Sequence, residues 1–340
     1  MSVKNNCKTI LKKLFILLIC AAAVTAPSCS SSARKYSVTY TDLFDTVTDF
    51  TAYCKSEAEF KKASDKLYSE LLRLHRLFDI YNEYDGVKNA AYLNRVCGEG
   101  AAELDPDIKA LIVSGLRSYG ETNGKLNVFS GAVLSVWHKY REAGNGVPTD
   151  AELKEAAKHI SADSVVTEGD TVRFTDKELR LDFGSIAKGY ASRVASDAVK
   201  SLGVKDFIIN IGGNVVVSGK KADGLWKIGV QNPFGDGIYA KLGASDVSVV
   251  TSGDYERYYE YNGKKYHHII DLDTLYPADG FCSVTVVCKD PEEADALSTA
   301  LFCMSVEEGR ALAEKYGAEV LWIKADGGSE RTKGFSAYEK

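Results

Sequence analysis

One short stretch of the sequence places oxygen-bearing side chains at a spacing that suits a metal ion. The stretch DPEEADALSTALF begins at Asp290, a favourable helix N-cap, and continues with Pro at the first helical position. Asp295 and Thr299, four residues apart, then share one face of a helix, with Ser298 beside them. A carboxylate and hydroxyls suit a hard cation such as Mg²⁺. The same spacing also occurs where such residues are surface or capping groups, so spacing alone leaves both interpretations open.

The segment LDFGSIAKGYA, residues 181–191, has the features of a phosphate-binding turn. A predicted strand ends at Asp182, Gly184 permits a tight turn, and a helix starts immediately afterwards. A helix N-terminus attracts phosphate through its free N–H groups and its dipole, and Lys188 adds a mobile positive charge. The GxxxxGK[ST] spacing of a Walker loop is absent from the sequence here. A solvated helix lysine is the alternative interpretation of Lys188.

A second glycine-containing turn lies in INIGGNVVVSG, residues 209–219. A buried strand is expected to end at Gly212 and Gly213, which are followed by Asn214. Two glycines allow another group to approach the backbone closely. On these residues alone, a plain β-turn is the favoured interpretation.

Two adjacent histidines occur in the segment 250–280. His267 and His268 are neighbours on a predicted strand and must face opposite sides of it, so at most one points into a given site. His268 shares a face with Ile270. No Ser-His-Asp spacing identifies a catalytic triad, although spacing does not exclude one. A structural role is the alternative for either histidine.

The predicted elements mix helices and strands without strict βαβ alternation, which indicates an α+β fold. Tyr258 to Ile270 is predicted to form a β-hairpin, because Asn262-Gly263 is a strong hairpin signal. Apolar periodicity and N-cap signals predict helices at 55–78, 105–120, from 149, 186–202, 291–303 and 305–317. Short apolar runs predict strands at 164–167, 171–174, 179–183, 206–211, 283–288 and 319–324.

The N-terminus is typical of an exported protein. Residues 1–28 combine a basic start with an apolar run that is too short to span a bilayer. Cys29 follows, as the lipidated first residue of a bacterial lipoprotein would, although ordinary secretion with cleavage nearby is the alternative. We therefore expect a signal peptide over 1–28, a flexible tether over 29–38, and one domain over 39–336. This domain is expected to be extracytoplasmic and anchored to the cell membrane by lipid.

The charge and the cysteine content argue against a nucleic-acid partner, a disulfide framework and a zinc site. Residues 1–28 carry four lysines and no acidic residue, so the net charge of −5 becomes −9 for the mature chain. No basic block stands out, which argues against a nucleic-acid partner. Five further cysteines are scattered without a CxxC pair and are expected to be buried apolar residues rather than disulfide or zinc ligands: Cys54, Cys97, Cys282, Cys288 and Cys303.

Taken together and in this order, the motifs resemble the ApbE-like flavin transferase family, the FAD:protein FMN transferases. Four matches carry the resemblance: DFGSIAKGYA, NIGGN, TSGDYERYY with YHHIID and YPAD, and ADALSTALF. They extend over roughly residues 40–325. The resemblance implies a single catalytic unit with mixed sheets and packed helices, of the flavin transferase, T-fold-related type. It also implies that the enzyme binds FAD with Mg²⁺, releases AMP, and links FMN through its phosphate to a Thr or Ser of an acceptor protein.

The resemblance also assigns roles to single residues. The metal ligands implied are Asp295, Ser298, Thr299 and the backbone carbonyl of Ser185. The implied FAD contacts are Asp182, Lys188 and Ile270, with Tyr81 near the adenine and Phe44, Lys125, Leu126 and Asn127 in the dinucleotide pocket. Leu126 and Asn127 stand where the family has Phe and Asp, and Phe44-Asp45 stands where it has Met-Gly. The sequence therefore departs most from the family pattern on the adenine side of the pocket. The acceptor hydroxyl needs a base; His268 is the candidate and Asp271 the reserve.

Three functions remain open on the sequence. The first is a Mg²⁺-dependent flavin transferase, with an extracytoplasmic subunit of an electron-transfer complex or an FMN-binding domain as the acceptor. The second is an FAD pyrophosphatase, in which water replaces the acceptor hydroxyl and the products are FMN and AMP. The third is a lipid-anchored, non-enzymatic flavin-binding protein.

Overall fold

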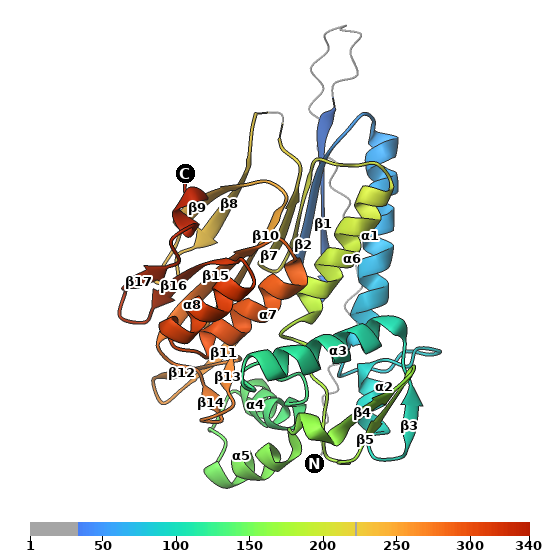
Figure 1. Cartoon of the computed structure of the whole chain (residues 1–340), viewed down its shortest axis with the longest axis vertical. Helices are drawn as coiled ribbons and strands as arrows, with labels where there is room; N and C mark the ends of the chain where they lie inside the picture. Colours follow the sequence, from blue (N-terminus) through green and yellow to red (C-terminus); the bar gives the residue numbers. More distant parts are fainter. Residues whose placement is uncertain (1–32, 222) are drawn as a thin grey trace, which may run out of the picture.

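An antiparallel sheet of eight strands forms the centre of the molecule (Figure 1). The structure, a computed structural model, describes residues 33–221 and 223–340. In spatial order the strands are β1 (Arg34–Leu43), β2 (Thr46–Cys54), β6 (Phe207–Ile211), β7 (Asn214–Ser218), β10 (Val247–Gly253), β15 (Phe281–Cys288), β16 (Glu319–Lys324) and β17 (Ser329–Arg331). Every neighbouring pair is antiparallel.

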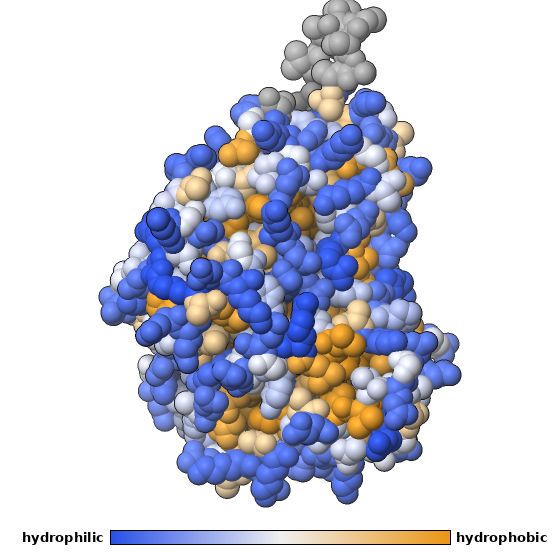
Figure 2. Space-filling model, viewed as in Figure 1, coloured by the Kyte–Doolittle hydropathy of each residue, from blue (hydrophilic) through white to orange (hydrophobic). Residues whose placement is uncertain are grey.

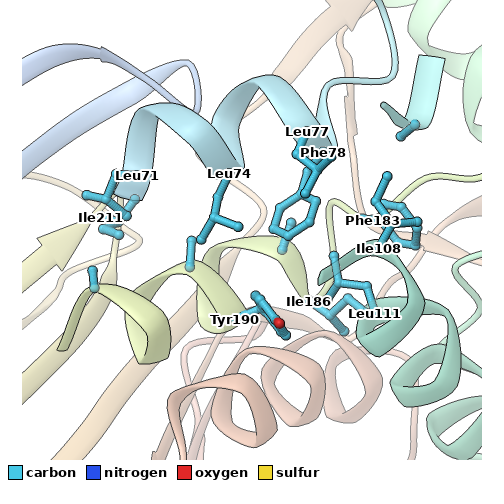
Figure 3. Packing of buried hydrophobic residues seen from close by; sticks show 14 of the residues in the cluster. Leu71, Leu74, Leu77, Phe78, Ile108, Leu111, Phe183, Ile186, Tyr190 and Ile211 are labelled. Atoms are coloured by element: carbon cyan, nitrogen blue, oxygen red, sulfur yellow. The ribbon is translucent and has the colours of Figure 1, made fainter. Parts of the chain in front are cut away.

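Four helices cover one face of this sheet (Figure 1). They are α1 (Glu57–Phe78), α6 (Ala187–Ser201), α7 (Pro291–Phe302) and α8 (Val306–Lys315). Their N-termini follow the capping signals in the sequence: Ser56 accepts the backbone N–H of Glu59, and Ser305 forms a capping box with Glu308. Figure 3 shows the resulting core, in which Leu74 and Phe78 of α1 lie against Tyr190 of α6.

The opposite face of the sheet is covered in part by the hairpin of β8 (Trp226–Gln231) and β9 (Ile238–Ala244), together with the short helix η3 (Phe335–Ala337). This arrangement explains why β16 is apolar and buried throughout its central residues 320–323. Trp322 packs with α7 and α8, whereas its neighbour Leu321 packs with β8 and β9. A strand buried on both faces has no polar side in its sequence pattern.

The remaining elements form a second layer below the helices (Figure 1). Its helices are α2 (Ala90–Arg95), α3 (Pro106–Glu121), α4 (Gly131–Ala143), α5 (Asp150–Ala156), η1 (Ala157–His159) and η2 (Ala162–Ser164). Its strands form a sheet of β3 (Ala101–Glu103), β5 (Thr171–Phe174) and β4 (Val165–Glu168), and two hairpins, β11 (Tyr258–Tyr261) with β12 (Lys264–His267) and β13 (Ile270–Asp271) with β14 (Tyr276–Pro277). Figure 2 shows apolar side chains gathered on this layer in the region of α3, where Val113 is half exposed.

The predicted α+β class is confirmed, and so are most of the predicted elements. The hairpin at Asn262-Gly263 is present, with both residues at positive φ. The five cysteines predicted to be buried apolar residues are buried and free. In the described part of the chain, no helix is long and apolar enough to span a membrane.

Two predictions about local structure are wrong. Residues 179–183 do not form a strand; they are an irregular segment with one isolated bridge, between Arg180 and Ser130, and a backbone hydrogen bond from Asp182 to the Val128 carbonyl. Residues 34–38, placed in the tether, are the first half of β1, where they pair with β2. The signal peptide and the lipidated Cys29 lie outside the described residues.

The close contact between α6 and α7 depends on Gly189. A Cβ at this position would lie 2.4 Å from the Pro291 carbonyl oxygen and 2.6 Å from Cβ of Asp295. Neither neighbour can rotate away, so the two helices would have to separate. We expect Gly189→Ala to lower the free energy of unfolding by about 2–3 kcal/mol, measured by denaturant titration. Gly203→Ala is the comparison, because Gly203 ends the same helix segment at φ +84 with open space around it; a loss at Gly189 no larger than that at Gly203 would contradict the packing explanation.

Candidate active site

A cleft of about 510 Å³ lies at the junction of the two layers. It is lined by the C-terminal end of α1, by α4, by the start of α6, by the β6–β7 turn and by the segments that follow β10 and β12. Most of the predicted site residues line it: Phe44, Tyr81, Lys125, Leu126, Asn127, Asp182, Ser185, Lys188, His268, Ile270, Asp295 and Thr299. Asp271 and Ser298 do not. Four separate motifs therefore converge on one cavity.

Asp295 is a buried carboxylate at the wall of this cleft. The residue is 2% exposed, and Oδ2 accepts the backbone N–H of Gly189 at 2.8 Å. Oδ1 lies 3.7 Å from Nζ of Lys188. Burial raises the pKa of Asp295, against the opposing effects of Lys188, the Gly189 N–H and the Asn214 amide. A buried carboxylate with one weakly paired oxygen is a suitable place for a cation.

The other predicted metal ligands differ in how they face the cleft. Thr299 lies one turn after Asp295 on α7, and Ser185 lies in the turn before α6; both line the cleft. Ser298 is fully buried, and its hydroxyl bonds to the Asp295 carbonyl at 2.9 Å and to the Ser252 hydroxyl at 2.8 Å. The structure therefore does not bring Ser298 to the cleft, because its oxygen is already used in the packing of α7 on β10.

The residues predicted to hold the metal offer oxygen ligands. Across residues 33–221 and 223–340, no group of three or more His, Cys, Asp and Glu side chains could hold a metal ion by itself. One carboxylate, a hydroxyl and backbone carbonyls are the donors that suit Mg²⁺, which keeps part of its water shell and takes phosphate oxygens from a substrate. The residues present thus fit the implied Mg²⁺, or another cation that prefers oxygen, rather than a metal that needs sulfur ligands.

The turn before α6 departs from the phosphate-binding geometry predicted from sequence. Asp182 Oδ1 accepts the N–H of Gly184 at 2.8 Å, which closes the turn. The N–H groups of Ile186 and Ala187 bond to the Phe183 carbonyl, and that of Gly189 bonds to Asp295. The first turn of α6 therefore has few free N–H groups for a phosphate, and positive charge at this wall comes from the side chain of Lys188 instead.

His268 is one of three histidines that line the cleft, and its surroundings favour the neutral ring. Burial, with the charges of Arg257 and Lys188, lowers the pKa of His268 to about 3. Its Nδ1 is buried and has no hydrogen-bond partner. The preceding His267 is different: its Nε2 donates to the Ala278 carbonyl at 2.8 Å, and its Nδ1 accepts the Ile269 N–H at 3.3 Å. The prediction that only one of the two rings faces the site agrees with these positions.

The lowered pKa of His268 makes stability depend on pH. The unfolded chain binds a proton at this ring below about pH 6.5, whereas the folded chain does not until about pH 3, so stability is lost as pH falls through this window. We expect the free energy of unfolding of His268→Gln, relative to the unsubstituted protein, to rise by about 2 kcal/mol between pH 7.5 and pH 5. Denaturant titrations at the two pH values measure this difference, to which the unchanged His267 does not contribute. If the free-energy difference between the two proteins is the same at pH 7.5 and pH 5, the pKa of His268 is not lowered by folding.

Asp271 is paired and does not point into the cleft. Its Oδ1 lies 2.9 Å from Nζ of Lys125, which also lies 2.8 Å from Asp273. Although burial opposes the charge of Lys125, hydrogen bonds to Asp273 and Asp271 raise its pKa to about 12. A carboxylate held by a permanently charged lysine is a poor base. The structure thus disfavours Asp271 as the reserve base and gives Lys125 a structural role beside the cleft.

The residues predicted to lie on the adenine side are held by neighbours that the sequence did not indicate. The Tyr81 ring lies 4.9 Å from that of His138 on α4, and His138 Nδ1 accepts from Arg141 at 2.7 Å. The backbone N–H of Phe44 bonds to His75 Nδ1 at 3.1 Å. Asn127 is occupied as well, since its amide donates to the Ile160 carbonyl and accepts the Phe129 N–H.

Sequence reasoning missed several residues that line the cleft. They are His75, His138, Arg141, Asn214 and Arg257. Arg257 lies inside the motif TSGDYERYY, and Asn214 lies inside NIGGN. Their membership of these motifs is the sequence signal that could have identified them. His138 and Arg141 lie three residues apart on α4 and share a helix face, but no motif marks them.

Comparison with known proteins places the chain in a family. A model of the ApbE family matches residues 44–322. The chain is 35% identical to the FAD:protein FMN transferase of Vibrio cholerae, over 64% of this chain and 67% of that protein. It is 28% identical to the FAD:protein FMN transferase of Treponema pallidum, over 95% and 93% of the two chains. Among solved structures, the ApbE protein of Thermotoga maritima superposes with a TM-score of 0.81 at 28% identity, covering 90% of this chain and all of that one.

Proposed function

The chain belongs to the ApbE family, and we infer from this that it is an enzyme that transfers FMN from FAD to an acceptor protein. We propose that the transfer depends on Mg²⁺, that a Thr or Ser hydroxyl receives the FMN, and that AMP is the second product. The observation that supports this most is the convergence of Asp295, Lys188 and His268 on one cleft. An extracytoplasmic electron-transfer subunit or an FMN-binding domain is the acceptor that we propose.

The proposed reaction exchanges one bond to phosphorus for another. The oxygen of the acceptor hydroxyl attacks the FMN phosphorus of FAD and forms a phosphoester bond. The phosphoanhydride bond breaks, and AMP leaves with its electron pair. The hydroxyl proton goes to the ring of His268, which is neutral and has an unpartnered nitrogen.

The charges of the cleft fit this chemistry. Negative charge builds on phosphate oxygens as the phosphoanhydride bond breaks. The positively charged side chains of Lys188 and Arg257 line the cleft and would stabilise this charge. Burial is the largest cause of the lowered pKa of His268, and these two charges lower it further. A bound diphosphate offsets them, so FAD binding raises the basicity of the ring when a base is needed.

Asp295, Thr299 and the carbonyl of Ser185 are the groups that would hold Mg²⁺, since all three residues line the cleft. When bound there, Mg²⁺ supplies Lewis-acid stabilisation of charge on the diphosphate. Ser298 supports this wall from behind, through its bond to Ser252. The Lys188 side chain stays near Asp295 as the second positive group.

The test is release of AMP from FAD by the purified mature chain, with Mg²⁺ or EDTA, and with or without a flavin-accepting domain. Acceptor-dependent, EDTA-sensitive AMP, with a fluorescent acceptor band that survives denaturation, is the result we expect. AMP released at the same rate without acceptor would instead identify an FAD pyrophosphatase. Absence of AMP despite FAD binding would contradict both activities.

We also propose that the enzyme is extracytoplasmic and held at the membrane by lipid on Cys29. The basic and apolar segments before Cys29 support this proposal. Metabolic labelling with a fatty acid is expected to mark the full chain and not Cys29→Ser. Equal labelling of both would place the lipid elsewhere, and labelling of neither would indicate ordinary secretion.

A further inference from the structure

Asn214 is a buried polar residue of the cleft with an unsatisfied oxygen. The residue is 2% exposed and lines the cleft, and its Oδ1 is buried without any hydrogen-bond partner. An amide oxygen can only accept, and leaving one unpaired in the interior costs about 1–3 kcal/mol. Nothing in the packing explains this cost, so the oxygen is placed for a group that arrives from outside.

The backbone holds Asn214 firmly in this position. It is the first residue of β7, after a two-residue turn in which Gly212 and Gly213 have φ values of +51° and +88°. The N–H of Gly213 bonds to the Asn210 side chain at 3.0 Å, and Asn214 itself pairs with Ile211 and with Val250 on either side. Pairing on both sides fixes the backbone of Asn214 and the direction of its Cα–Cβ bond, so the amide stays at the wall of the cleft.

The neighbours of Asn214 determine what its oxygen can bind. The side-chain amide of Asn214 hydrogen-bonds to the carboxyl of Asp295, and α7, which carries Asp295, packs against β7. The NH₂ group must face the carboxylate, because two acceptors would repel each other. The unpaired Oδ1 then remains as a second acceptor in the pocket that holds Asp295 and, one helical turn further along α7, Thr299. Buried acceptors gathered around one carboxylate suit a cation.

We propose that Asn214 supplies an oxygen ligand to the divalent cation of this cleft, in the place that the sequence assigns to Ser298. This inference rests on the proposed Mg²⁺ dependence. It gives the cation side chains from two elements, α7 and the start of β7, so the cation joins the helix layer to the central sheet at the site. The hydroxyl of Ser298 is not available for this role, since Ser252 and the Asp295 carbonyl hold it.

The test measures metal binding directly, without turnover. Mn²⁺ is titrated into the full mature chain and free Mn²⁺ is followed by electron paramagnetic resonance, with and without ADP as a diphosphate that contains no FMN. Asn214→Leu has nearly the same shape and no oxygen, and we expect it to weaken Mn²⁺ binding by about 10- to 100-fold. Asn214→Asp adds a charge and is expected to bind Mn²⁺ more tightly than the unsubstituted protein. Ser298→Ala compares the residue that the sequence predicted as the ligand, and we expect a smaller loss of Mn²⁺ affinity than in Asn214→Leu.

Each outcome has a defined meaning. Unchanged affinity in Asn214→Leu, together with loss in Asp295→Asn, would overturn the role of Asn214 and leave the proposed metal site standing. If Asn214→Leu does not fold, Asn214→Asp decides, and affinity equal to or weaker than that of the unsubstituted protein would overturn the inference. A loss in Ser298→Ala equal to that in Asn214→Leu would restore Ser298 as the ligand. No saturable binding by the unsubstituted protein, with or without ADP, would overturn the proposed Mg²⁺ site as well.

Discussion

Replacing Asp295 with Asn is expected to lower FMN transfer by at least about 10³-fold while the fold is kept. The substitution removes the negative charge at the cleft but leaves an oxygen that can accept the Gly189 N–H, now bonded to Oδ2 at 2.8 Å. The contact between α6 and α7 should therefore persist. The measurement is the rate of acceptor-dependent AMP release at saturating FAD and Mg²⁺.

The melting temperature of Asp295→Asn should respond to Mg²⁺ differently from that of the unsubstituted protein. Burial raises the pKa of Asp295, so at pH 7 its charge costs stability in the metal-free protein, and this cost is absent below the ordinary pKa of the carboxyl. Without metal, Asp295→Asn is expected to melt at the same temperature or higher. With excess Mg²⁺, only the unsubstituted protein should gain stability, because only it binds the cation.

Glu292→Gln is a suitable control for the loss of a carboxylate from the same helix. Glu292 pairs with Arg193 at 3.1 Å and lies outside the cleft, so its transfer rate is expected to stay within about threefold. Transfer by Asp295→Asn within tenfold of the unsubstituted rate would remove Asp295 from the metal site. An equal gain in melting temperature on adding Mg²⁺ would do the same.

Local signals in the sequence account for the elements that were predicted correctly. Ser305 and Glu308 specify the start of α8 by a capping box, and Asn262-Gly263 specifies the β11–β12 turn. Such signals act within a few residues and need no knowledge of the fold. The β1–β2 hairpin carries no such local signal. Its turn is Phe44-Asp45, with φ values of +53° and +52°, which these residue types rarely adopt. Pairing with β6, far along the chain, stabilises that turn.

The candidate site was predicted in its membership and less well in its geometry. The order of four motifs indicated Asp295, Lys188 and His268, and the structure places all three on one cleft. Side-chain direction was not accessible from spacing: Ser298 turns to a serine 46 residues away in the chain, and Asp271 to a lysine 146 residues away. Partners at such separations are set by how the layers pack, and no local pattern contains them.

Replacing His268 is expected to abolish transfer and leave FAD binding largely intact. The unpartnered ring nitrogen is the only part of His268 that the proposed step uses, and loss of a general base lowers a rate by about 10²- to 10⁴-fold. His268→Gln keeps a polar side chain of similar length and removes the basic nitrogen. The measurements are FAD affinity from flavin fluorescence and the acceptor-dependent rate of AMP release.

The neighbouring histidine provides the contrast. His267 is buried and bonds through Nε2 to the Ala278 carbonyl at 2.8 Å, so His267→Gln should be less stable than the unsubstituted protein and still transfer FMN where it is folded. His268→Gln should show the reverse, a stable protein without transfer. Because the two rings are adjacent in sequence, a general disturbance of the β12 end would affect both variants alike. Collapse of FAD binding in His268→Gln would make that ring structural, and would return the search for the base to the remaining groups of the cleft.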